Sequence, residues 1–61
     1  MPLITLELGQ ITKEQKAALV RELVAKASEI THIPEQAFMT IIRENSMDNV
    51  GNGTMLLSDR K

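Results

Sequence analysis

The stretch LITLELGQITKEQ (residues 3–15) decides the fold, because a strand, a break and a helix start follow one another within it. The segment Leu3–Leu8 alternates with the two-residue period of a strand, so its even-numbered and odd-numbered residues point to opposite faces. The segment Gly9–Ile11 interrupts the alternation, and Thr12 followed by Gln15 forms a capping-box pattern. We therefore predict a strand followed closely by a helix.

The predicted helix spans about residues 13–31 and has one buried face. Placing its residues at 100° intervals gathers six apolar side chains in one arc: Leu19, Val20, Leu23, Val24, Ala27 and Ile30. Glu22 and Lys26 have the spacing of an ion pair on the outer face, and Lys13 and Lys16 are expected to be solvated.

The helix ends before Pro34, because the residue that precedes a proline is pushed out of helical geometry. Residues 34–37 can add one short turn, and Phe38–Arg43 is predicted to be a second strand with apolar groups on both faces. Residues 49–53 carry a turn signal, and Thr54–Leu57 can form a short terminal strand.

These elements predict an α+β fold in a single domain, residues 1–61: one β-α-β unit with parallel strands and a right-handed crossover, plus a C-terminal hairpin. One helix covers only one face of a two-stranded sheet, and a chain of 61 residues buries little surface by itself. With no cysteine for disulfides, we expect other copies of the chain to cover the second face.

The composition of the chain argues against several classes of binding partner. Seven basic and eight acidic residues in no block argue against nucleic acid, and the absence of a long apolar run or a signal-peptide start argues against a membrane. The single histidine, His32, cannot form a metal site by itself. We expect a cytoplasmic protein with a small-molecule substrate and no metal.

Four motifs in order resemble the 4-oxalocrotonate tautomerase family over essentially the whole chain: Met1–Ile4, Thr12–Lys16, Ile41-Ile42 and the glycines of residues 51–53. The resemblance implies a homohexamer, built as a trimer of dimers, in which the initiator methionine is removed. It also implies an isomerase without a cofactor, in which the nitrogen of Pro2 is the catalytic base for enol–keto proton transfer.

The chemistry of an N-terminal Pro2 fits this role. An α-amino group ordinarily titrates at about 7.7–8.0, and apolar surroundings lower its pKa toward cellular pH, where a base works best. If Met1 stays attached, the nitrogen of Pro2 is an amide and cannot act as a base. The alternative interpretation of Pro2 is a residue merely tolerated at the start of a strand.

The chain also departs from the family it resembles. The resemblance implies two substrate-binding arginines and one aromatic residue, but those positions fall on Ile11, Met39 and Val50, which are all aliphatic. We place these three residues at the substrate, together with Leu8.

Arg43 is the best replacement for a missing arginine, and it would have to reach the Pro2 of another subunit. The strand from Met39 to Arg43 measures about 13 Å, which is too long for contact within one chain. The alternative is an exposed arginine paired with Glu7 or Glu44 that contributes little.

Three functions stay open. The first is a tautomerase-like isomerase acting through Pro2 on a small 2-hydroxydienoate or arylpyruvate-type acid. The second is hydration, dehalogenation or decarboxylation of an acrylate-type acid. The third is an oligomeric scaffold or binding protein with little or no tautomerase activity, which the missing arginines favour.

Overall fold

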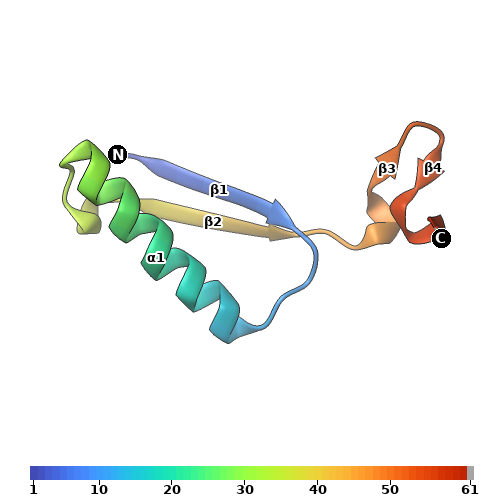
Figure 1. Ribbon diagram of the computed structural model, residues 1–61, viewed down its shortest axis with the longest axis horizontal. Coiled ribbons are helices and arrows are strands. Elements are labelled where there is room, and N and C mark those ends of the chain that lie inside the picture. The colour runs from blue at the N-terminus through green and yellow to red at the C-terminus, as the bar shows by residue number, and fades with distance from the viewer. Residues whose placement is uncertain (61) are drawn as a thin grey trace.

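The chain, described for residues 1–60 by a computed structural model, folds as a β-α-β unit followed by a small hairpin (Figure 1). Its elements in order are β1 (Leu3–Leu8), α1 (Lys13–Thr31), η1 (Glu35–Ala37), β2 (Met39–Glu44), η2 (Met47–Asn49), β3 (Gly51–Asn52), β4 (Met55–Leu56) and η3 (Leu57–Asp59). The predicted α+β class, the β-α-β unit and the C-terminal hairpin are confirmed.

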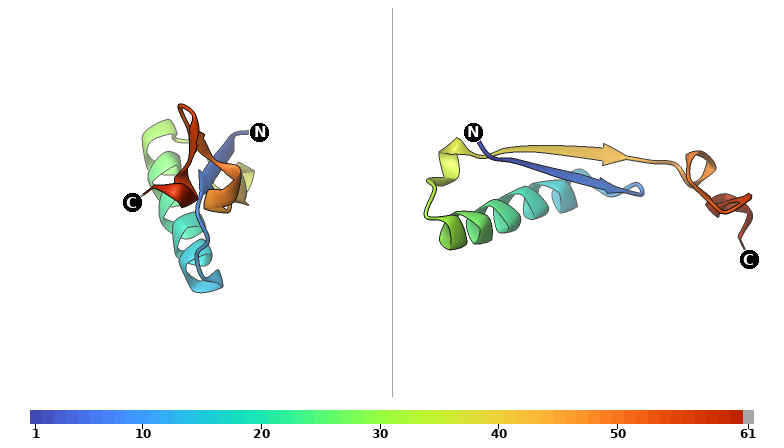
Figure 2. Two further views of the ribbon diagram at one scale, coloured as in Figure 1. Left: turned by 90° about the vertical axis from the view of Figure 1, so that its right-hand side faces the viewer. Right: turned by 90° about the horizontal axis from the view of Figure 1, so that it is seen from above.

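Strands β1 and β2 pair in parallel, with a register that runs from Leu3 opposite Met39 to Leu8 opposite Glu44. Helix α1 lies along one face of this sheet (Figure 2). In β1, and in β2 up to Ile42, the even-numbered residues are half-buried on the helix side and the odd-numbered residues are exposed, so the two sets lie on opposite faces as predicted for β1. We call the odd-numbered side the open face; its large apolar side chains are Leu3, Met39 and Ile41, exposed by 53%, 52% and 40%.

Helix α1 begins and ends where the sequence predicts, because both ends are fixed locally. The Gln15 N–H donates to Thr12 Oγ1 at 3.1 Å, and the Thr12 N–H donates to Gln15 Oε1 at 2.9 Å, which completes the capping box. At the other end His32 adopts a left-handed φ of 62°, and its N–H donates to the Ser28 carbonyl at 2.8 Å.

Two predicted details of the helix are wrong. Ile30 and Val20 are predicted to lie in the buried arc but are 70% and 37% exposed. Ile30 lies in the last turn of α1, whereas Leu19 and Leu23, which flank it on the helical wheel, are half-buried. The predicted Glu22–Lys26 pair does not form, since Glu22 pairs with Arg21 at 3.1 Å and Lys26 with Glu29 at 3.0 Å.

The second strand begins one residue later than predicted. The Phe38 N–H donates to the Glu35 carbonyl at 3.1 Å and so closes η1, which confirms the predicted short turn before β2. Strand β2 therefore starts at Met39 and continues to Glu44.

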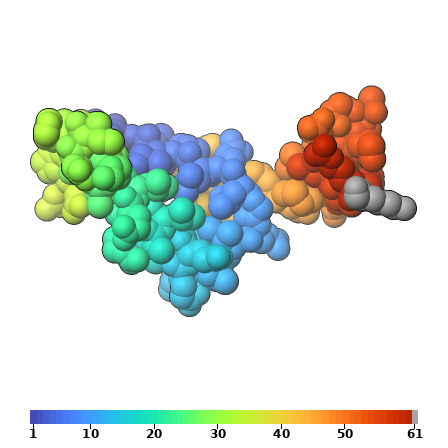
Figure 3. Space-filling model, in the orientation of Figure 1, coloured from blue at the N-terminus to red at the C-terminus, as the bar shows by residue number. Residues whose placement is uncertain are grey.

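Residues 45–60, which we call the C-terminal arm, extend beyond the end of the β1–β2 sheet (Figures 1 and 3). Strands β3 and β4 pair antiparallel within the arm, and Gly53 supplies the positive φ of 63° that the turn needs. The arm gives the chain a radius of gyration of 14.9 Å, whereas a compact domain of this length measures about 10–11 Å.

The chain by itself has little core. None of residues 1–60 is fully buried, and the accessible surface of 4924 Å² exceeds the roughly 4,000 Å² of a compact protein of this size. Among the elements of residues 1–60, α1 included, no helix combines the length and apolar character that crossing a bilayer requires.

Candidate functional site

Pro2 and Met39 are neighbours at the end of the sheet where both strands begin. Pro2 lies directly before β1, is half-buried, and accepts a hydrogen bond at its carbonyl oxygen from the Met39 N–H at 2.9 Å. Met39 stands opposite Leu3 on the open face. The side chains next to these two in the sequence, Leu3 and Phe38 among them, carry no charge.

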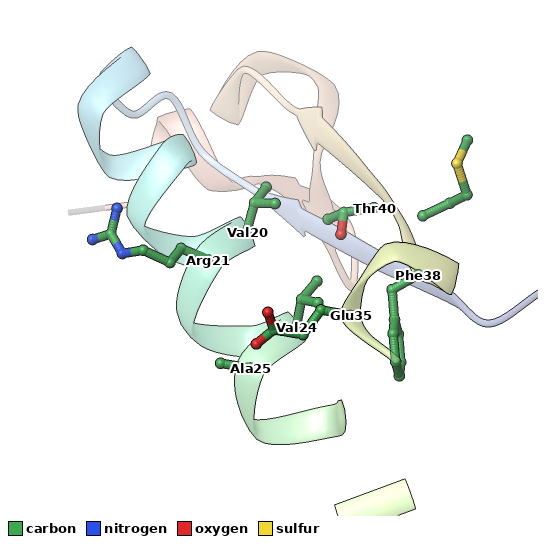
Figure 4. A pocket seen from close by; sticks show the side chains of 8 residues that line it. Val20, Arg21, Val24, Ala25, Glu35, Phe38 and Thr40 are labelled. Carbon is green, nitrogen blue, oxygen red and sulfur yellow. The ribbon is translucent and has the colours of Figure 1, made fainter. Parts of the chain in front are cut away.

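A groove of about 390 Å³ between α1 and the start of β2 includes Met39 in its wall (Figure 4). The other residues that line it are Val20, Arg21, Val24, Ala25, Glu35, Phe38 and Thr40. Figure 4 shows Val20 and Val24 on the helix side and Phe38 and Thr40 on the strand side. The groove is mainly apolar and has one cation and one carboxylate among its residues.

Leu8, Ile11 and Arg43 lie toward the opposite end of the sheet. Leu8 ends β1 and accepts the Asn45 N–H at 2.7 Å, and Ile11 follows in the loop that leads to α1. Arg43 stands opposite Glu7 on the open face. Six residue-to-residue steps along the strand lead from Pro2 to Leu8, a distance of about 20 Å.

The ion pairs at this end of the sheet do not include the predicted pairing of Arg43 with Glu7 or Glu44. Glu44 pairs with Lys16, Nζ to Oε1 at 2.7 Å, so Lys16 is not simply solvated as predicted. Within residues 1–60 no ion pair involves Arg43, which leaves its guanidinium exposed on the open face.

Val50 belongs to the C-terminal arm. It is half-buried, and its carbonyl oxygen accepts the Leu57 N–H at 2.8 Å. A hollow of about 410 Å³ where the arm leaves the sheet is lined by both Val50 and Leu8; its other residues are Glu7, Gly9, Asn45, Met47 and Asn49. The hollow therefore brings two of the predicted substrate residues together.

A single chain thus divides the predicted site into two groups. Pro2 and Met39 lie at one end of the sheet, and Leu8, Ile11, Arg43 and Val50 lie at or beyond the other. In this chain Met1 is attached to Pro2, so the proline nitrogen is part of a peptide bond. Met1 itself is 87% exposed.

Glu44 is the residue at this end that sequence reasoning missed. Its Oε1 accepts from the Lys16 ammonium, and its Oε2 accepts the Ile11 N–H at 3.1 Å. These contacts, first the Lys16 hydrogen bond and then the Ile11 amide, hold the pKa of the Glu44 carboxyl below its ordinary value. Its partners Lys16 and Ile11 are 28 and 33 residues away in the sequence, so no local spacing pattern predicts these contacts.

Comparison with known proteins gives a consistent family signal. The family model described as "Tautomerase enzyme" matches residues 2–60. Proteins of Bacillus cereus and Bacillus anthracis, each named "Probable tautomerase", are 36% identical over 61 residues, which covers 98% of this chain and 100% of theirs.

Solved structures show the same likeness in three dimensions. The crystal structure of YwhB, described as a homologue of 4-oxalocrotonate tautomerase, superposes with a TM-score of 0.90 at 28% identity and covers 98% of this chain and 100% of its own. A second homologue of 4-oxalocrotonate tautomerase gives a TM-score of 0.87 at 29% identity, with 100% and 98% covered.

Proposed function

The chain belongs to the tautomerase enzyme family, whose members are isomerases, and we propose that Pro2 is its catalytic base once Met1 has been removed. The observation that carries the proposal is the position of Pro2 in a member of this family: half-buried at the start of β1, behind an exposed methionine. The hydrogen bond from the Met39 N–H to the Pro2 carbonyl oxygen holds Pro2 in place and does not involve the Pro2 nitrogen.

The proposed reaction moves one proton and changes no other atom. The neutral amine of Pro2 accepts the hydroxyl proton of an enol, and the C=C double bond shifts to form C=O. The resulting ammonium group then returns the proton to carbon. Uncharged neighbours such as Leu3 and Met39 favour the neutral amine, because they solvate the ammonium form poorly.

We propose a small acid of the 2-hydroxydienoate or arylpyruvate type as the substrate, acted on without a cofactor in the cytoplasm. Met39 beside Pro2 offers apolar contact and no charge, which suits a substrate whose reacting end is not a second carboxylate. Ile11, Leu8 and Val50 would add apolar contacts. Arg43, which has no ion pair within residues 1–60, would reach from another copy of the chain and bind the single carboxylate of the substrate.

We further propose a homo-oligomer, and specifically a hexamer arranged as a trimer of dimers. Three properties of the isolated chain support association: its missing core, its apolar open face and its extended C-terminal arm. Association would also let residues from opposite ends of two sheets meet at one Pro2. Sedimentation of the protein at micromolar concentration tests this, and a monomer would refute it.

The central experiment combines three measurements on one sample. Intact mass establishes whether Met1 is removed, and NMR titration of the Pro2 amine establishes its pKa. A screen with the enol forms of phenylpyruvate and 2-hydroxymuconate then measures ketonisation, and NMR of the products distinguishes isomerisation from added water. We expect a lowered pKa of the Pro2 amine and faster turnover of phenylpyruvate, which has one carboxylate, than of 2-hydroxymuconate, which has two. A normal amine pKa without turnover of either substrate refutes the proposal.

A second function, a scaffold of the same fold without useful activity, is favoured by one observation. Ile11, Met39 and Val50 bring no charge to the places where the resemblance implies two arginines and an aromatic residue. An intact oligomer whose Pro2 amine titrates normally would support this function in place of catalysis.

A further inference from the structure

Three elements meet at the side chain of Glu44. Glu44 itself ends β2, Ile11 belongs to the loop between β1 and α1, and Lys16 lies in the first turns of α1. One carboxylate accepts from both partners, at 3.1 Å from the Ile11 nitrogen and 2.7 Å from Lys16 Nζ. No other side chain in residues 1–60 ties all three elements together by hydrogen bonds.

The Ile11 N–H has no hydrogen-bond acceptor within the helix, so its acceptor comes from another element of the fold. Ile11 precedes the cap residue Thr12, whose own N–H is used by the Gln15 side chain at 2.9 Å. The first helical N–H bond runs from Lys16 to the Thr12 carbonyl at 3.0 Å and leaves Ile11 outside the helix.

The loop is then fixed at each of its ends. The Asn45 N–H holds the Leu8 carbonyl at 2.7 Å, the capping box holds Thr12, and between them Glu44 holds Ile11. Gly9 lies between these points, and its flexible backbone gives the loop no stiffness of its own. Within residues 1–60, Glu44 is therefore the side chain that holds the Ile11 backbone, and the Ile11 side chain lines a hollow beside Leu19 and Leu23 of α1.

We propose that Glu44 is a positioning residue: by accepting hydrogen bonds from the Ile11 N–H and the Lys16 ammonium, it sets where Ile11 meets the substrate. This inference rests on the proposed function, in which Ile11 contributes an apolar substrate contact. Glu44 touches neither Pro2 nor the reacting atoms, so its removal weakens substrate binding and leaves the proton-transfer step nearly intact.

The charges around Glu44 are few. Lys16 on α1 is its ion-pair partner. The other ionisable groups of the two strands are Glu7 on β1 and Arg43 on β2, and those in the first turn of α1 are Lys13 and Glu14. Glu7 and Arg43 point to the open face, away from the helix side. The lowered pKa of Glu44 agrees with this arrangement, since Lys16 and the Ile11 amide both favour the carboxylate.

The first test reads the contact without measuring activity. In the parent protein the NMR shift of the Ile11 amide should follow a titration below the ordinary glutamate pKa, and in Glu44→Gln that inflection should vanish. Amide hydrogen exchange at Ile11 should become at least tenfold faster in Glu44→Ala. The matched control is Glu29→Gln, because Glu29 has an ion pair with Lys26 at 3.0 Å but no contact with the loop. An Ile11 amide that ignores the Glu44 substitutions overturns the proposal.

The second test separates binding from chemistry. We expect Glu44→Ala to raise KM about three- to tenfold with kcat changed less than twofold, and Lys16→Met, which keeps the Ile11 contact, to have a smaller effect. Glu29→Ala should match the parent. An unchanged KM in Glu44→Ala, measured beside a parent whose turnover depends on Pro2, overturns the positioning role alone. A parent without Pro2-dependent turnover overturns the proposed function instead.

Discussion

The two ends of the β1–β2 sheet differ in what they offer. Where the strands begin, Pro2 and Met39 are joined by a backbone hydrogen bond of 2.9 Å, and Leu3 and Phe38 beside them in the chain are uncharged. The groove next to Met39 is mainly apolar, with Arg21 and Glu35 in its wall. Where the strands end, Glu44 connects Ile11 and Lys16 through a charged cluster. Parallel pairing causes this division, because it places both strand starts together and both strand ends together. One end carries the proposed base, while the other connects the loop before α1 to the end of β2.

Replacing Pro2 should have the largest effect. We expect Pro2→Ala to lower kcat/KM for enol ketonisation by about 10²–10⁴, the range of a general base, because a primary amine replaces the secondary amine. The control is Pro34→Ala, which changes an exposed proline at the start of η1. Steady-state kinetics, with intact mass to verify removal of Met1, makes the measurement. Equal losses in both variants would show that Pro2 matters only for folding.

A charge on the open face should disrupt assembly. Ile41 is 40% exposed in the single chain, at the centre of β2. We expect Ile41→Asp to dissociate the oligomer, since an unpaired carboxylate buried against another copy costs several kcal/mol. Analytical ultracentrifugation measures the change. The control, Gln36→Asp, adds the same charge at an exposed position of η1; an Ile41→Asp protein that sediments like this control would contradict the role of the open face.

A cation beside Pro2 should change substrate preference. We expect Met39→Arg to raise kcat/KM for a dicarboxylic enol relative to a monocarboxylic one by about tenfold, the value of one charged hydrogen bond. Met55→Arg on the arm is the matched control, because Met55 and Met39 are exposed by 50% and 52%. Competition between the two substrates, followed by NMR, gives the ratio directly. An unchanged ratio would mean that position 39 lies outside the substrate contact.

The features that could be predicted from the sequence are those with local causes. The bounds of α1 follow from the capping box at Thr12 and the proline after residue 33, and the strand faces follow from alternation. The exposure of Ile30 and the Lys16–Glu44 pair depend on what lies across the fold, which no short spacing encodes. The same applies to the candidate site: strand pairing brings Met39 to Pro2, whereas the other predicted substrate residues lie at or beyond the far end of the sheet.

Removing the helix cap should have a modest effect on stability. We expect Thr12→Ala to lower the free energy of unfolding by about 1 kcal/mol per chain, because the Gln15 N–H loses its acceptor at 3.1 Å. Thr54→Ala, in the exposed turn of the arm, is the control. Denaturant unfolding at one protein concentration compares them. If the two variants unfolded together, the cap would not contribute to the measured stability.

The smallest effect concerns acid, and its direction follows from the sign of the Glu44 shift. The Lys16 hydrogen bond and the Ile11 amide lower the folded pKa of Glu44, so its contribution to stability is complete above the unfolded value of about 4.3. That contribution is lost as the pH falls through the lower folded pKa. We therefore expect the thermal midpoint of the parent to fall on acidification more than that of Glu44→Gln, with the two curves converging at low pH. Glu29→Gln should follow the parent, because Lys26 and Glu29 are 65% and 69% exposed and their pair is well screened. If the curves of parent and Glu44→Gln stayed parallel throughout, the charged end of the sheet would add nothing beyond a surface ion pair, and the contrast between the two ends would reduce to the chemistry at Pro2.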